Sequence, residues 1–189
     1  MTGPDNEDGG PVKTFLEHLD DLRRVILAGL AVVIVGMVAA SHYAPWFLKI
    51  LKEPLRRVGR DPDTFLRTFT VTGAMNVAIQ IVVWGGLLLS LPVIIIIVGR
   101  YLIPALYRRE KGAIVVGLGG ALLMFIAGVA TAYFLALPPA LKVLCWFNEW
   151  LGIPLEFLTV TDYIGFVLIM MVCFGLMFEL PVVVLLLGH

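Results

Sequence analysis

The residues of this sequence best suited to chemistry are the carboxylates of one short charged stretch, Phe15 to Arg24. Glu17, Asp20 and Asp21 lie close together there, and a helix would gather them on one surface. A guanidinium group is a planar fork that pairs two-pronged with a carboxylate, so an acidic surface of this kind suits a ligand that carries arginine. On spacing alone, the more common interpretation of such charges is the solvated end of a helix.

The same stretch predicts where a helix begins. Thr14 stands three residues before Glu17, the spacing of a capping box in which each side chain satisfies a free backbone N–H of the first turn. Asp20 and Arg24 have the i,i+4 spacing that favours an ion pair on a helix. Apolar residues at helical spacing predict one stripe beside the acidic surface: Phe15, Leu19, Leu22 and Ile26.

A second candidate is Glu179, which lies near the end of a long apolar segment. An ionisable side chain in a membrane helix is costly, so by default it faces the bundle interior or a wet cavity and has a function. Two classes of function remain open from the residues alone. In a proton- or ion-coupled transporter, Glu179 would be the carrier acid. In a receptor for a basic peptide, the site would be the surface carboxylates Asp20, Asp21 and Glu110.

The elements that position these residues are membrane helices. The chain has 189 residues, of which 60% are hydrophobic and 15% charged, and its mean hydropathy of +0.96 is too high for a soluble globular domain. Segments that are apolar for about 20 residues or more can cross the hydrocarbon core, and continuous apolar runs exclude the alternating pattern of a barrel. The fold class is therefore all-α, a polytopic membrane helix bundle. The four expected transmembrane helices are Leu22 to Tyr43, Ala74 to Val98, Ala113 to Leu137 and Val160 to Leu187.

Other classes of protein and site are disfavoured. The formal net charge is zero, so no basic excess argues for nucleic acid. Cys145 and Cys173 are far apart, and the three histidines have no ligand spacing, so we expect no disulfide, metal site or cofactor. No cluster of catalytic residue types points to an enzyme. Residues 1–12 are rich in Gly, Pro, Asp and Asn, which predicts a disordered tail rather than a signal peptide.

The connecting segments carry the interfacial features. Loop one, Ala44 to Gly73, predicts a short amphipathic helix on a membrane surface that stops near Pro54 or Gly59. Loop three, Pro138 to Thr159, carries tryptophans that suit an interfacial belt. Loops one and three together hold seven basic residues, and the N-terminal stretch with loop two, Gly99 to Gly112, also holds seven. The positive-inside rule therefore gives no orientation.

Small and polar residues shape the second and third apolar segments. The second contains Gln80 and a Gly-Gly pair among other polar residues, which makes it kinkable. The third contains small residues four apart, and these permit close packing of helices: Gly117 with Ala121, and Gly128 with Ala132.

Motifs spread along the chain resemble those of the TatC family, the receptor subunits of the twin-arginine protein translocase. They occur in the family's order and spacing from Phe15 onward. They are Glu17-His18-Leu19-Asp20-Asp21-Leu22-Arg23, Pro54-Leu55, Leu91-Pro92-Val93, Pro104-Ala105-Leu106-Tyr107-Arg108-Arg109-Glu110, Ala132-Tyr133-Phe134 and Phe174-Gly175-Leu176-Met177-Phe178-Glu179-Leu180-Pro181.

The resemblance implies a signal-peptide site on the cytoplasmic face of a bacterial inner membrane, with the N-terminus in the cytoplasm. By motif position, Asp21 and Glu110 would receive the paired arginines of the signal peptide, with Glu17 and Arg23 shaping the same surface. The family usually has glutamate where Asp21 stands. The charge is kept, and the reach is shorter by one methylene.

The resemblance also implies how the complex assembles. Glu179 matches an acidic residue on the concave side of the bundle, where it would meet the signal helix or single-span subunits. The implied partners are TatA-type and TatB-type subunits, other TatC copies and folded precursor proteins, and transport would use the proton-motive force without nucleotide. The family has six membrane helices, so residues 13–189 are expected to be a TatC-like domain that lacks the last two, either as a fragment of a longer chain or as a shortened relative.

Overall fold

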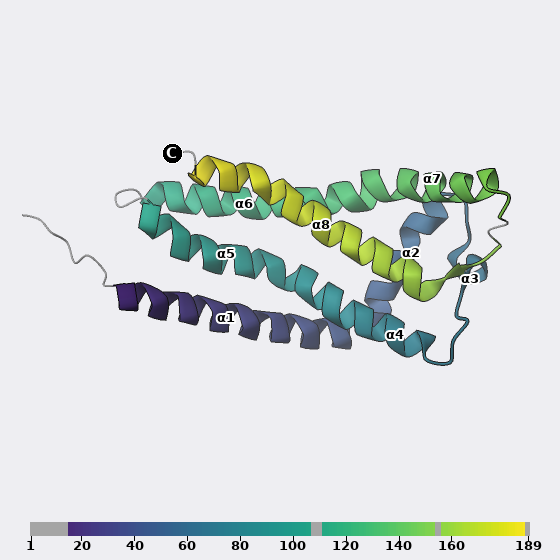
Figure 1. Cartoon of the computed structure of the whole chain (residues 1–189), viewed down its shortest axis with the longest axis horizontal. Helices are drawn as coiled ribbons and strands as arrows, with labels where there is room; N and C mark the ends of the chain where they lie inside the picture. Colours follow the sequence, from purple (N-terminus) through teal and green to yellow (C-terminus); the bar gives the residue numbers. More distant parts are fainter. Residues whose placement is uncertain (1–14, 107–110, 154–155, 188–189) are drawn as a thin grey trace, which may run out of the picture.

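The computed structural model describes residues 15–106, 111–153 and 156–187, and it is a bundle of long helices (Figure 1). Within these residues, four helical stretches are long and apolar enough to cross a membrane, which confirms the all-α polytopic fold. The first stretch is α1 (Phe15–His42), and the fourth is α8 (Val160–Leu187). The second is α4 (Gly73–Gln80), the π-helical segment η1 (Ile81–Gly85) and α5 (Gly86–Leu106). The third is α6 (Lys111–Thr131), the π-helical segment η2 (Ala132–Ala136) and α7 (Leu137–Trp150).

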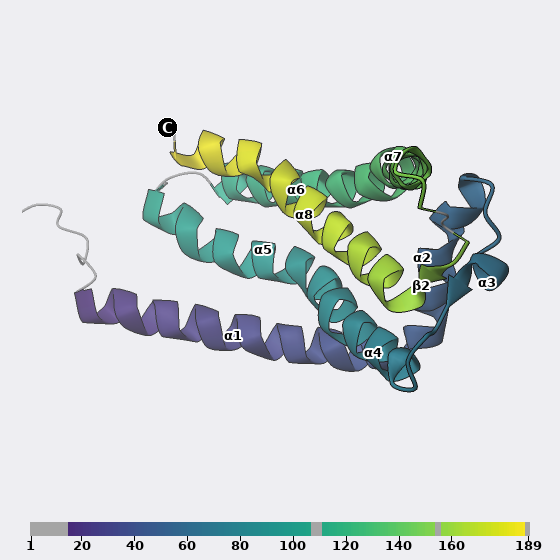
Figure 2. The same cartoon turned by 45° about the vertical axis from the view of Figure 1, so that its right-hand side comes forward.

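Short elements close one end of the bundle. They are α2 (Ala44–Arg57), α3 (Pro62–Phe65), β1 (Leu66–Arg67) and β2 (Leu158–Thr159). The two strands pair in parallel, with Leu66 opposite Leu158. This pairing joins loop one to loop three, so both loops lie at the same end. The start of α1, the end of α5, the start of α6 and the end of α8 lie at the other end (Figures 1 and 2).

The core is built around α8. Its first half buries Tyr163, Ile164, Val167 and Leu168 almost completely, and α4, η1, η2 and α2 pack against it. By contrast, only 6% of the membrane-spanning part of α1 is buried, against 44% for α8. α1 is therefore a peripheral helix whose surface is left mostly for lipid or for another protein.

The crossing of α1 and α5 explains how α1 is held. A side chain at Gly36 would collide with Ser90 Oγ, and a Cβ at Gly86 would lie 2.7 Å from the Cα of Met37. The hydroxyl of Ser90 donates to the carbonyl oxygens of Gly86 at 2.7 Å and Val32 at 3.1 Å. Small residues thus let the two backbones touch. The expected stripe does not make this contact, because its described members Leu19, Leu22 and Ile26 are 39 to 60% exposed.

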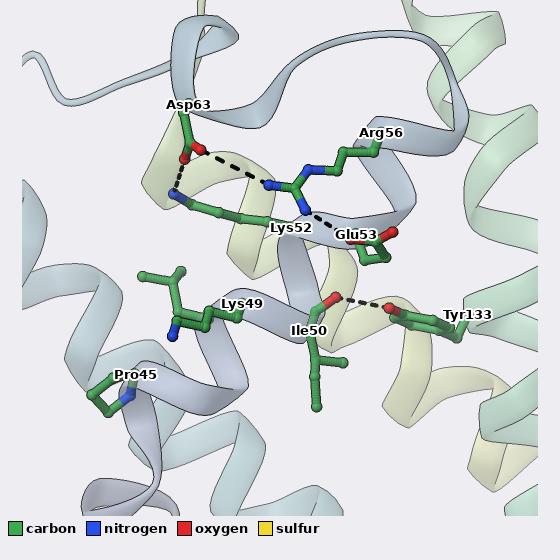
Figure 3. A pocket seen from close by; sticks show the side chains of 9 residues that line it. Pro45, Lys49, Ile50, Lys52, Glu53, Arg56, Asp63 and Tyr133 are labelled. Carbon is green, nitrogen blue, oxygen red and sulfur yellow. Dashed lines mark hydrogen bonds and ion pairs between the residues drawn. The ribbon is translucent and has the colours of Figure 1, made fainter.

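Pro54 lies inside α2, and the expectation that the helix could stop there is wrong. Proline has no N–H for the carbonyl of the residue four positions earlier, which is Ile50. The hydroxyl of Tyr133 on η2 donates to that carbonyl oxygen at 2.8 Å (Figure 3), and the hydroxyl of Tyr163 on α8 donates to the carbonyl of Leu51 at 2.8 Å. The helix therefore continues to Arg57 and ends before Gly59, whose φ of +81° requires glycine.

Tyr133→Phe is expected to destabilise the protein because it removes the donor that replaces the missing N–H of Pro54. Leaving a part-buried carbonyl without a partner costs about 1 to 2 kcal/mol, so the unfolding temperature in detergent should fall. Tyr43→Phe is the matched control, since Tyr43 is 57% exposed at the start of α2. Equal unfolding temperatures for the two variants would contradict this role of Tyr133.

Most of loop three is helical, which corrects the expectation of a loop from Pro138 onward. α7 extends the third helix to Trp150, and its two prolines fall in the first turn, where no N–H is required of them. The π-helical segment η2 joins α6 to α7 at this junction. Trp146 and Trp150 are 60% and 67% exposed on α7, as an interfacial belt requires.

The small residues of α6 divide into two groups. At Gly128, an added Cβ would lie 2.7 Å from the carbonyl oxygen of Phe174 and 2.9 Å from the Cβ of Phe178. Here α6 and α8 pack closely, as predicted. Of the other predicted pair, Ala121 is buried with 4% exposure, whereas an added Cβ at Gly117 would meet nothing within 4 Å, so the described residues show no close approach at Gly117.

Candidate functional site

The acidic surface lies on the first turns of α1. The predicted ion pair forms, with Arg24 Nη2 3.2 Å from Asp20 Oδ2. Both side chains are more than half exposed, so the pair contributes little to stability, on the order of 0 to 1 kcal/mol. Asp21 is partly buried and has an interaction partner within the chain, whereas Arg23 is exposed. The ion pair therefore engages Asp20 with a residue of its own helix.

The structure does not describe the side chains of two candidate residues, Glu17 and Glu110. Glu17 belongs to the first turn of α1, and its side chain lies outside the described part of the structure. Glu110 lies outside the described residues altogether, between the end of α5 at Leu106 and the start of α6 at Lys111. These two helix ends lie at the same end of the bundle as the start of α1 (Figures 1 and 2). The start of α1, the end of α5 and the start of α6 are thus on one side of the apolar spans.

Glu179 is buried near the end of α8, with 9% of the residue exposed. It lies 17 residues beyond Asp162, or about 25 Å along the helix at 1.5 Å per residue, in the half towards the start of α1. One carboxylate oxygen, Oε1, is buried without a hydrogen-bond partner among the described residues. A buried polar atom of this kind is uncommon and requires an explanation, such as a partner outside the chain.

A second buried oxygen without a partner in the described part is Gln80 Oε1, at the junction of α4 and η1. The amide packs against Gly165 of α8, where an added Cβ would lie 3.3 Å from this oxygen. Sequence reasoning identified Gln80 only as a polar residue of a kinkable helix. The π-helical segment that follows it could not be predicted from the apolar pattern.

The two tyrosines that hold α2 were missed as a pair, although a signal for them exists in the sequence. A buried tyrosine in an apolar segment needs a partner for its hydroxyl, and a proline within an amphipathic helix leaves a carbonyl without its donor. Tyr133 and Pro54 satisfy each other's requirements in this way, and Tyr163 finds its partner in the next carbonyl of α2, that of Leu51.

The described residues contain no metal-binding group and no disulfide. No group of three or more His, Cys, Asp or Glu residues there could hold a metal ion. Cys145 on α7 and Cys173 on α8 are both free thiols.

Known proteins resemble this chain over most of its length. The family model described as Sec-independent protein translocase protein (TatC) matches residues 17–189. The TatC protein of Aquifex aeolicus is 37% identical over 169 residues, which cover 88% of this chain and 69% of that protein. The TatC protein of Escherichia coli K12 is 30% identical over 182 residues, which cover 96% and 68%. A crystal structure of the twin-arginine translocase receptor TatC superposes with a TM-score of 0.80 at 35% identity and covers 90% of this chain and 74% of that one.

Proposed function

The chain belongs to the TatC family of Sec-independent protein translocase proteins, and from this membership we propose that it binds twin-arginine signal peptides and forms the core scaffold of the translocase. The observation that supports the proposal is that the start of α1, which carries Asp21, lies at the same end of the bundle as the end of α5 and the start of α6, which flank Glu110 in the sequence. A single peptide on one side of the membrane can reach both. The precursor proteins would be folded and exported across the bacterial inner membrane.

The chemistry of the site rests on two carboxylates. Asp21 and Glu110 would each receive one guanidinium group of the arginine pair, because a carboxylate accepts two parallel hydrogen bonds from arginine. Glu17, one helical turn before Asp21, would add negative charge to the same surface. Arg23 is exposed on α1 and would limit the number of ligand cations that this surface accepts. A cytosolic ligand requires a cytoplasmic N-terminus, which is the orientation proposed here.

Glu179 would serve a later step. Its buried oxygen without a hydrogen-bond partner in the described part supports a contact with a group from another polypeptide. A donor on the signal helix, or on a TatA-type or TatB-type single-span subunit, would satisfy this oxygen within the membrane. Together with other TatC copies, these subunits would complete a complex driven by the proton-motive force without nucleotide.

An ion- or proton-coupled transporter is the alternative function, with Glu179 as the carrier acid. The same buried carboxylate favours it, since intramembrane acids also serve as proton or ion carriers. The two functions differ in their need for other subunits. Flux of an ion or solute through the purified chain in vesicles, without partner subunits, would favour the transporter.

The receptor proposal is tested by crosslinking a twin-arginine signal peptide to the membrane-inserted protein. Asp21→Ala and Glu110→Ala are each expected to reduce crosslinking at least about tenfold, because each removes a charge-assisted pair worth about 1.5 to 3 kcal/mol. Glu149→Ala is the matched control, since Glu149 is an exposed carboxylate on α7 at the opposite end. Unchanged crosslinking in both test variants, with normal insertion, would reject the site.

A further inference from the structure

The end of the bundle opposite Asp21 contains a cavity of about 650 Å³ between α2, α3 and η2 (Figure 3). Charged side chains of α2 and α3 form a network along it. Lys52 Nζ lies 3.1 Å from Asp63 Oδ1, and Arg56 lies 3.3 Å from Glu53 and 3.9 Å from Asp63. The proposed function uses none of these residues.

Two further cations are not neutralised by this network. Lys49 lines the cavity but reaches neither carboxylate (Figure 3). Arg57 follows Arg56 on α2, and its guanidinium lies 4.7 Å from the ring centre of Phe134 and 5.7 Å from that of Tyr133. Within the described residues, neither Lys49 nor Arg57 pairs with a carboxylate. Together with the network, this group therefore contains four cationic side chains and two carboxylates, and its net charge is positive.

An apolar groove of about 340 Å³ begins where the cavity ends. Ile50 and Tyr133 line both, so the two spaces are adjacent. From Tyr133 the groove follows α6 back to Phe125, a distance of about 12 Å at 1.5 Å per residue. Its other walls are apolar residues of α5 and α8, among them Leu88 and Met171. The groove thus runs from a cationic mouth into the membrane-spanning part of the bundle.

The mouth lies at the level expected for lipid headgroups. α2 begins at Ala44, directly after the apolar span of α1 ends at His42. Trp46 on α2 is 58% exposed, which is typical of a side chain at the membrane–water boundary. A cationic cluster at this level attracts an anionic headgroup, and a guanidinium group binds phosphate in a two-pronged manner.

We propose that the cavity and groove together form a binding site for one anionic phospholipid. The headgroup lies at the mouth beside Tyr133, where Lys49, which lines the cavity, and Arg57, which stands over two rings of the groove, supply the positive charge. One acyl chain occupies the groove below Tyr133. A transmembrane helix of another protein fits less well, because a helix with its side chains is about 10 to 12 Å across and needs more room than a groove of about 340 Å³ offers. The lipid would fasten α2 to α6 on the same side as the Tyr133 hydroxyl.

The proposal is tested by native mass spectrometry of the purified chain with phosphatidylglycerol or phosphatidylcholine of identical acyl chains. The wild-type protein is expected to retain phosphatidylglycerol at least about tenfold more strongly. The double variant Lys49→Ala/Arg57→Ala should lose this preference, whereas Lys49→Arg should keep it. Lys142→Ala is the matched control, since Lys142 is an exposed lysine of α7 at the same end.

A groove variant tests the acyl chain separately. Ala130→Trp places an indole in the groove and should reduce retention of both lipids, whatever the headgroup. Equal retention of the two lipids by the wild-type protein would overturn the proposal. It would also be overturned if inorganic phosphate displaced the lipid at millimolar concentration, or if Ala130→Trp released a bound protein subunit and left lipid retention unchanged.

Discussion

Replacing Asp21 by lysine is expected to abolish export of a twin-arginine reporter protein, whereas Asp21→Glu should preserve it. The lysine variant turns attraction into repulsion against a ligand that carries two positive charges. At 4 Å, a pair of unit charges near a protein surface interacts with about 4 kcal/mol, against about 1 kcal/mol in bulk water. Asp21 is partly buried, so the interaction energy of its side chain should lie between these two values. We therefore expect signal-peptide affinity to fall by at least about a hundredfold, or about 2.7 kcal/mol.

The measurement is export of the reporter from cells, together with crosslinking of its signal peptide in isolated membranes. Asp20→Lys is the matched control because it changes the net charge of α1 equally, one residue away. Asp20 is exposed, whereas Asp21 is partly buried, and Asp20 is not the carboxylate proposed to receive the arginine, so this control should reduce export less. Normal export by the Asp21→Lys variant, at normal protein levels, would contradict the role of Asp21.

Gly86→Leu is expected to separate α1 from α5. Even a Cβ at this position would lie 2.7 Å from the Cα and 2.8 Å from the backbone nitrogen of Met37, and backbone atoms cannot move aside as a flexible side chain can. Overpacking of this kind typically costs about 1 to 3 kcal/mol. The hydrogen bond from Ser90 to the carbonyl of Val32 should be lost in the same variant. We expect a lower unfolding temperature in detergent and reduced export.

Gly29→Leu is the matched control, because an added Cβ at Gly29 of α1 would meet nothing within 4 Å. The functional loss in Gly86→Leu has a geometric reason. Asp21 lies 15 residues before Gly36, or about 22 Å along α1, so a small tilt at the crossing displaces it relative to the end of α5 and the start of α6. Equal stability of the two variants would show that the crossing does not hold α1.

The apolar segments predicted the four membrane-spanning stretches well, because each runs continuously for longer than the bilayer requires. The pairing of Asp20 with Arg24 also followed from spacing. Elements that depend on long-range contacts were not predictable. β1 and β2 are two residues each and carry no alternating pattern, so their pairing depends on two loops that meet only in the fold.

The prolines illustrate the same limit. Pro54 predicts the end of a helix because it lacks a backbone N–H donor. The replacement donor is the hydroxyl of Tyr133, which is far away in the sequence and becomes apparent only in the fold. Pro138 reads as the start of a loop, although a proline in the first turn is compatible with a continuing helix. For the candidate site, spacing identified the acidic start of α1, but the shared end of α1, α5 and α6 follows from the whole bundle.

The way in which α2 is attached has a consequence for sequence divergence. Tyr133 and Tyr163 donate to main-chain carbonyl oxygens, and every residue type offers such an oxygen. The identities of residues 50 and 51 are therefore irrelevant to these two bonds. Mutations on the outer face of α2 can therefore change the surface that it presents to lipid or to other proteins. The hydroxyl groups of Tyr133 and Tyr163 still hold the helix in place.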